Sequence, residues 1–257
     1  MKKKIGLALS GGGARGFAHI GVLKVLVEKN IPVHMIAGTS AGSIVGGAFA
    51  SGMAMDEIVS MARSIGWTDL GRPSLSPLGF FSNEPMGRFL ERNFPVSSFE
   101  KFPIPFAAVA CDLDTGEQVI LKDAGDAIFA IRASCAVPGV FMPLVEDGRM
   151  LVDGGSVKPL PCDILREMGA DIVIAVDVLS CGSSFRSRPR TALGVTIQSA
   201  MTLIRTASRN QHYLADIIVE PQIAHLRPDE IKKCDEFIEL GAKAAIAKIE
   251  ALSDATS

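Results

Sequence analysis

The sequence predicts an α/β protein whose mostly parallel central sheet is covered by helices on both faces. Short apolar, β-branched runs alternate with segments of helical period along most of the 257 residues, which is the pattern of strand–helix–strand units. Hydrophobic residues make up 48% of the chain, enough for a large core, so disordered and collagen-like classes are excluded. No linker, repeat or low-complexity tract divides the chain, and we therefore expect a single domain over residues 1–257.

Strands are expected where a short apolar run lies between turn residues, and helices where apolar residues recur every three to four positions. The segment Glu117–Lys122 follows Thr115-Gly116 and predicts an antiparallel partner for the strand before it. The other predicted strands are Lys4–Leu9, Pro32–Ala37, Ile104–Cys111, Met150–Val152, Asp171–Val178 and Asp216–Val219. The predicted helices are Gly16–Lys29, Ala41–Ser51, Asp56–Ile65, Pro85–Asn93, Ala124–Cys135, Cys162–Met168, Leu193–His212 and Asp229–Ala251.

The interval Gly66–Phe102 differs in composition from the rest of the chain. It is rich in Gly, Pro, Ser and Phe and contains the single Trp, Trp67. Two interpretations stay open: a mobile apolar cap or lid over a pocket, or a long connection that packs its aromatic side chains on the core. The Arg-rich loop Ser180–Arg190 is interpreted as a solvated or disordered surface loop.

Charge and cysteine content exclude several classes of partner and cofactor. Lys and Arg together number 26 and Asp and Glu 28, giving a formal charge of −2, so no general field directs the chain onto nucleic acid. The five cysteines lack any CxxC spacing, which predicts neither a disulfide framework nor a zinc site. We expect no metal and no cofactor, and a reducing, cytoplasmic environment.

Two segments invite comparison with targeting or membrane signals. The apolar stretch Ile5–Leu9 follows a basic start but is shorter than the roughly seven residues that a signal peptide needs. The uncharged run Met35–Met55 consists mainly of Gly, Ala, Ser and Thr, so its hydrophobic drive toward a bilayer is weak. We therefore expect neither a leader peptide nor a membrane span.

The most specific local motif is the segment Gly38-Thr39-Ser40-Ala41-Gly42, which follows a predicted strand and opens a predicted helix. This context fits a nucleophile elbow, in which a serine is held on a strained strand-to-helix turn. Flanking glycines permit the close backbone approach that such a turn needs. Ser40 at a helix N-terminus would also lie where negative charge is favoured.

A glycine-rich loop, Gly11-Gly12-Gly13-Ala14-Arg15-Gly16, likewise follows a strand and opens a helix. It satisfies GxGxxG, but no acidic residue follows at the end of the second strand to hold a ribose. No Gly-Lys-Ser/Thr closes it as a phosphate-binding P-loop. The remaining interpretation is a set of backbone N–H groups suited to an oxyanion hole. Arg15 is expected either to contact a substrate phosphate or to support the loop through a salt bridge.

A serine nucleophile needs a base, and the four histidines offer poor candidates. His212 and His225 are interpreted as surface residues and His19 as a helix-surface or packing residue. Asp153 is the better candidate, because a predicted strand stops in Asp153-Gly154-Gly155 and leaves a carboxylate on a glycine-containing turn. Position alone does not decide between Asp153 and the other carboxylates at strand ends, which are Asp112, Asp114 and Asp177.

Four segments, GGGARGFAHIGVL, GTSAG, ASCAVPGVFMP and DGG, resemble in order and spacing the sequence blocks of bacterial patatin-like phospholipases. The resemblance covers nearly the whole chain. It implies a three-layer α/β/α fold and lipid acyl hydrolysis by a Ser–Asp dyad without histidine, which maps onto Ser40 as nucleophile and Asp153 as base. It maps the oxyanion hole onto Gly11, Gly12 and Gly13. The supporting motif residues are Arg15, Gly16, Gly38, Gly42, Gly154 and Gly155.

The expected function is hydrolysis of a carboxylic ester of a lipid, either a phospholipid or a lysophospholipid. Two alternatives stay open: an acyltransferase that uses the same acyl enzyme, and a lipid-binding module without turnover. We expect a cytoplasmic protein with peripheral contact to the inner membrane through the aromatic residues of Gly66–Phe102.

Overall fold

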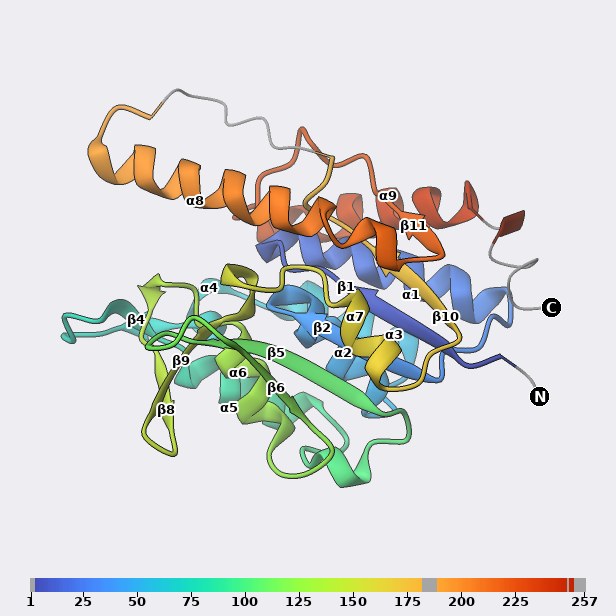
Figure 1. Ribbon diagram of the computed structural model, residues 1–257, viewed down its shortest axis with the longest axis horizontal. Helices are drawn as coiled ribbons and strands as arrows, with labels where there is room; N and C mark the ends of the chain where they lie inside the picture. Colours follow the sequence, from blue (N-terminus) through green and yellow to red (C-terminus); the bar gives the residue numbers. More distant parts are fainter. Residues whose placement is uncertain (1–2, 182–188, 249, 252–257) are drawn as a thin grey trace.

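The computed structural model describes residues 3–181, 189–248 and 250–251 (Figure 1). In this part of the chain, eight strands form one sheet in the order β11-β10-β1-β2-β5-β9-β8, with β6 also paired to β5. Strands β11, β10, β1, β2 and β5 are parallel, whereas β6, β8 and β9 run antiparallel to their neighbours. The strands are β1 (Ile5–Leu9), β2 (Met35–Thr39), β5 (Phe106–Asp112), β6 (Gln118–Lys122), β8 (Leu144–Glu146), β9 (Arg149–Asp153), β10 (Ile172–Val176) and β11 (Ile217–Val219).

Helices cover both faces of this sheet. The first face packs against α1 (Phe17–Glu28), α2 (Ala41–Ala50), α3 (Met55–Ser64), α5 (Glu84–Asn93), α6 (Ala127–Ser134) and α9 (Cys234–Ile246). The second packs against α7 (Cys162–Glu167) and the short helix η4 (His212–Leu214). A further helix, α8 (Ala192–Arg209), precedes η4. The expected three-layer α/β/α fold with a mostly parallel sheet is therefore confirmed.

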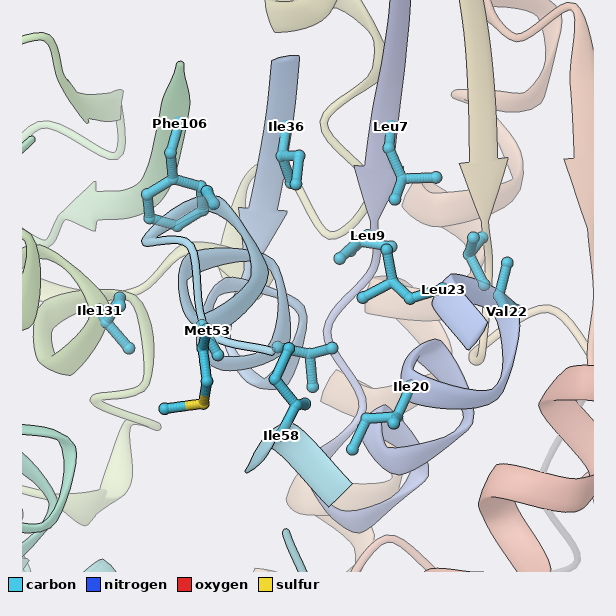
Figure 2. Packing of buried hydrophobic residues seen from close by; sticks show 14 of the residues in the cluster. Leu7, Leu9, Ile20, Val22, Leu23, Ile36, Met53, Ile58, Phe106 and Ile131 are labelled. Carbon is cyan, nitrogen blue, oxygen red and sulfur yellow. The ribbon is translucent and has the colours of Figure 1, made fainter. Parts of the chain in front are cut away.

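The two-sided core follows from the alternation of side chains along the strands. Figure 2 shows Leu7, Leu9, Ile36 and Phe106 directed from the sheet toward the helices of the first face. Their neighbour Ala8 packs in a separate cluster on the second face. Each fully buried Leu, Ile or Phe contributes roughly 1.5–3 kcal/mol through removal of apolar surface from water.

A second, three-stranded sheet lies outside the main one and was not predicted. It contains β3 (Arg72–Pro73), β4 (Gly79–Ser82) and β7 (Gly139–Phe141) in the order β3-β4-β7. The short helix α4 (Trp67–Leu70) precedes it and was also missed. All four elements have four residues or fewer, too few for a hydrophobic period to appear in the sequence.

Several predicted boundaries were wrong by a few residues. Strand β2 is shifted toward Ser40 relative to Pro32–Ala37, because Gly38 and Thr39 pair with β5. Helix α6 begins after Asp126, whose side chain accepts the Ile128 N–H and caps the helix. The helix predicted from Asp229 begins only at Cys234, after the 3-10 helix η5 (Ile231–Lys233). Most of the Arg-rich loop, residues 182–188, lies outside the described residues.

The uncharged run Met35–Met55 forms strand β2 and helix α2. Among the described residues, none of the helices combines the length and the apolar character that a membrane crossing requires.

Candidate active site

Ser40 occupies the turn between β2 and α2. Its backbone has φ 52° and ψ −124°, a conformation that costs a non-glycine residue of order 1–3 kcal/mol. Gly42 makes this turn sterically feasible, because a Cβ there would lie 2.3 Å from the Leu9 carbonyl oxygen. The chain therefore forms the strained strand–turn–helix geometry that the sequence motif predicts.

Hydrogen bonds hold Ser40 at both backbone groups and at its side chain. Its N–H donates to Ser134 Oγ at 2.8 Å, and its carbonyl oxygen accepts from Ser43 Oγ at 2.6 Å. Its Oγ donates to Asp153 Oδ2 at 2.6 Å. Ser134, the last residue of α6, was missed by the sequence reasoning, although it is a polar residue within the ASCAVPG segment.

Strand pairing explains why Ser40 meets Asp153. Strand β6 pairs with β5 from Ala107 to Cys111 and so occupies one whole edge of it. Strands β2 and β9 must share the other edge: β2 ends with Thr39 opposite Val109, and antiparallel β9 ends with Asp153 opposite Ala110. The carboxyl ends of the two strands therefore meet head to head, which places the Ser40 and Asp153 side chains within hydrogen-bond distance.

Asp153 is 6% exposed and its carboxylate has two hydrogen-bond donors. Ser40 Oγ donates to Oδ2, and the Gly155 N–H donates to Oδ1 at 2.7 Å. Gly154 lets the turn cross β5, because a Cβ there would lie 2.2 Å from the Val109 carbonyl oxygen. Burial raises the pKa of Asp153 to about 6, although the two hydrogen bonds act in the opposite direction. A base whose pKa lies near neutral pH accepts a proton more effectively than an ordinary carboxylate, whose pKa is about 4.

The glycine-rich loop lies against Ser40. A Cβ on Gly11 would lie 3.3 Å from the Ser40 Cβ, but the Gly11 N–H donates to the Pro159 carbonyl oxygen at 3.0 Å. The expectation that Gly11 is an oxyanion donor is therefore not supported by this geometry. Within the described part of the chain, no acceptor engages the N–H groups of Gly12 and Gly13, whose φ values are 157° and 59°.

Two further features complete the surroundings of this loop. Ala41 is the first residue of α2, so its N–H has no helical acceptor, and it lines the same cavity as Gly13. Arg15 is 3% exposed, and its Nε and Nη2 donate to the Leu226 carbonyl oxygen at 3.1 and 2.8 Å. Arg15 thus supports the loop through this carbonyl group. Gly16 lies against α2, since a Cβ there would be 2.5 Å from the Ala41 Cβ.

The histidines have other partners. His19 is fully buried and its Nε2 lies 2.8 Å from the Ser10 carbonyl oxygen, while burial lowers its pKa to about 4. His34 Nδ1 accepts the Ile5 N–H, and the exposed His225 contacts Glu236. The side chain of His212 is 21% exposed, and its Nε2 lies 2.8 Å from Oδ2 of the buried Asp177.

The rival carboxylates also have their own local partners. Asp177 accepts hydrogen bonds from Ser208 Oγ and the Leu179 N–H in addition to His212. Asp112 accepts the Asp114 N–H at 3.0 Å. Across the described residues, no three His, Cys, Asp or Glu side chains are grouped as metal ligands.

An apolar cavity of about 190 Å³ opens beside Ser40. Three helices contribute much of its wall: α2 through Ile44 and Val45, α4 through Trp67, and α5 through Met86. The other lining residues are Gly13, Ala14, Gly16, Phe17, Ser40, Ala41, Ile65, Leu70, Cys135, Val137, Val140, Phe141, Pro228 and Ile231. Part of the Gly66–Phe102 interval therefore lines the cavity, whereas its Phe89 and Phe94 pack in the core.

A three-layer α/β/α fold that places a serine on a strand–helix turn beside a buried carboxylate has the architecture of serine hydrolases. The particular family follows from comparison with known proteins. The model of the patatin-like phospholipase family matches residues 7–166, more than half of the chain. The chain belongs to the patatin-like phospholipase family.

Relatives in sequence agree with this assignment, and a solved structure shares the fold. An uncharacterized NTE family protein of Mycobacterium tuberculosis is 40% identical over 178 residues, which cover 68% of this chain and 49% of the relative. Lysophospholipase NTE1 of Mycosarcoma maydis is 36% identical over 209 residues, covering 78% of this chain and 11% of that protein. The crystal structure of VipD from Legionella pneumophila shares the fold with a TM-score of 0.58 at 13% identity, covering 100% of this chain and 67% of that one.

The chain spans about half the length of the mycobacterial relative and a much smaller share of the fungal one.

Proposed function

We propose that this chain is a serine acyl hydrolase that cleaves carboxylic esters of lipids. The 2.6 Å hydrogen bond from Ser40 Oγ to Asp153 Oδ2 is the observation that carries the proposal. A strained turn presents the hydroxyl, and a buried carboxylate with a pKa raised to about 6 accepts from it. The family assignment independently supports lipid acyl hydrolysis.

In the proposed reaction, Ser40 Oγ attacks the ester carbonyl carbon while Asp153 accepts the hydroxyl proton. The N–H groups of Gly12, Gly13 and Ala41 stabilise the negative charge on the carbonyl oxygen. Asp153 then gives the proton to the departing alcohol, and an acyl-serine ester remains. Water attacks this ester with Asp153 again as base, which releases the fatty acid and restores Ser40.

The cavity supports an acyl chain as the part of the substrate bound beside Ser40. Its walls are formed almost entirely by apolar side chains, which favour a hydrocarbon over a sugar or a nucleotide. The name of the fungal relative, a lysophospholipase, supports a phospholipid or lysophospholipid as substrate class. A single domain over residues 1–257, with 66–102 as its cap or lid, and a cytoplasmic location stay predictions.

The test is covalent labelling with a fluorophosphonate probe, read by intact mass. Wild-type protein should gain one adduct, Ser40→Ala should gain none, and Ser64→Ala, which changes an exposed serine on α3, should label like wild type. Hydrolysis of a p-nitrophenyl acyl ester should fall at least about a thousandfold in Ser40→Ala and Asp153→Asn. Undiminished turnover by Ser40→Ala would refute the assignment of the nucleophile.

The same assay separates the alternatives. A new ester formed when a lysolipid or another alcohol is added would indicate an acyltransferase that uses the same acyl enzyme. A well-folded wild-type protein that gains no adduct would indicate a lipid-binding module without turnover.

A further inference from the structure

A group of large apolar side chains is exposed around the second sheet. Leu75 is fully exposed at 105%, Phe80 is 68% exposed and Trp67 58%. Leu78, Val137 and Val140 are exposed as well. These six residues are named the apolar rim. Solvent contact of so many large apolar groups in one region costs free energy, and such patches mark interaction sites.

Five of the six rim residues, all except Trp67, lie in two segments that contain no charged side chain. None occurs between Arg72 and Glu84 or between Arg132 and Glu146. Strand β4 of the first segment pairs in parallel with β7 of the second, with Gly79 opposite Gly139. These five residues therefore lie together on and around β4 and β7, and are not scattered over the surface. The charged residue of the second sheet, Arg72 of β3, is paired with Glu84.

This surface is continuous with the cavity beside Ser40. Trp67, Val137 and Val140 line the cavity and are also 58%, 38% and 41% exposed to solvent. The mouth of the cavity consequently lies within the rim. Phe141, which also lines the cavity, packs against Phe81 of β4, so apolar side chains link the hairpin to the cavity wall.

We propose that the apolar rim docks on a lipid bilayer with neutral headgroups and inserts Leu75, Leu78 and Phe80 into its interface. The inference rests on the proposed function, because a phospholipid ester delivered to Ser40 must leave a bilayer. A protein partner or a second copy seated on the rim would cover the mouth of the cavity, whereas a bilayer supplies the substrate there. Apolar and aromatic side chains at the headgroup level are the usual anchors of peripheral proteins.

The chemistry of the rim sets two expectations. Burial of one Leu or Phe side chain strengthens partition by at least about tenfold, so loss of two inserted side chains should be easily measured. Because the rim has no charged side chain, binding should not require anionic lipid, and salt should not weaken it.

The experiment measures sedimentation of the protein with phosphatidylcholine vesicles in a Ser40→Ala background, which prevents consumption of lipid. The Leu75→Ser, Phe80→Ser variant should partition at least about tenfold more weakly. The matched control changes Val27 and Ile246 to Ser; these are 46% and 57% exposed on α1 and α9, and this variant should bind like the Ser40→Ala parent. Partition should be equal at low and high salt.

Equal partition of the rim variant and the control would overturn the proposal. Binding that needs phosphatidylglycerol and disappears in high salt would also overturn it. So would a dimer, measured by sedimentation velocity, that becomes a monomer in the rim variant, since that result assigns the rim to a second copy.

A separate assay on the Ser40-containing protein isolates the proposed function. With a water-soluble short-chain ester, the Leu75→Ser, Phe80→Ser variant should turn over substrate like wild type. If wild type fails to cleave this ester while rim-dependent vesicle binding remains, the hydrolase assignment is wrong and the docking surface stands.

Discussion

Asp153→Asn should make the protein more stable above pH 6 while it abolishes ester cleavage. The asparagine keeps the size of the side chain and can still accept the Gly155 N–H, but it carries no titratable proton. In the wild type, burial raises the pKa of Asp153 to about 6, against about 4 in the unfolded chain. The difference corresponds to ~3 kcal/mol.

The direction follows from proton counts. Between pH 4 and 6 the folded wild type retains a proton that the unfolded chain has released, so its stability falls as pH rises through this window. Above about pH 6 this loss of stability in the wild type is complete and no longer changes with pH. The Asp153→Asn variant carries no such deficit, and it should therefore exceed the wild type by ~3 kcal/mol, or roughly 5–10 °C in Tm, whereas the two proteins should be similar near pH 4.

The assay is thermal unfolding of both proteins from pH 4 to 8. Contributions from other groups, such as His212 and Asp177, cancel in the difference. Ser40→Ala supplies a second test, because it removes a hydrogen bond that lowers the pKa of Asp153; its stability should decline over a window that extends to higher pH. A difference between wild type and Asp153→Asn that stays constant across this range would refute the buried, proton-retaining carboxylate.

Three further predictions concern the cavity, the serine turn and the histidine nearest a buried acid. Met86→Ala should enlarge the cavity and shift the preferred acyl length upward in a series of p-nitrophenyl esters, with each added methylene contributing ~0.8 kcal/mol to binding. An unchanged optimal acyl length would exclude Met86 from the acyl site. Gly42→Ala should destabilise the folded protein by about 3 kcal/mol or more in urea unfolding, because its Cβ would lie 2.3 Å from the Leu9 carbonyl oxygen. The control Gly66→Ala should be tolerated, because the nearest atom to its Cβ would lie 3.4 Å away. His212→Ala should leave turnover unchanged but lower the free energy of unfolding by about 1–2 kcal/mol at pH 6 and by less at pH 9. The hydrogen bond to Asp177 raises the pKa of His212, and the protonated form is lost as pH rises. A loss of turnover comparable to that of Asp153→Asn would restore a histidine to the mechanism.

Local sequence was sufficient to predict the strand-to-helix turn at Ser40, because this turn depends on neighbours in the chain: a strand, two glycines and a helix of small residues. The parallel β1–β2 pair was equally predictable, and it brings the glycine loop beside Ser40 as expected. These features need no long-range information.

Asp153 could not be separated from its rivals by the same reasoning. Its position opposite Ser40 depends on which edge of β5 receives β9, and that pairing joins residues far apart in the chain. The partner of His212 could not be predicted for a similar reason, since Asp177 lies 35 positions away. The second sheet was missed because strands as short as Arg72–Pro73 carry no period of their own.

The head-to-head meeting of β2 and β9 on one edge of β5 also affects how such a protein can diverge. Ser40 and Asp153 are 113 positions apart, yet their separation is defined by the single step from Val109 to Ala110 in β5. Segments outside these strands, the 66–102 interval among them, can lengthen or change composition without displacing either side chain. The fold thus fixes the distance between Ser40 and Asp153 independently of the segments that line the cavity.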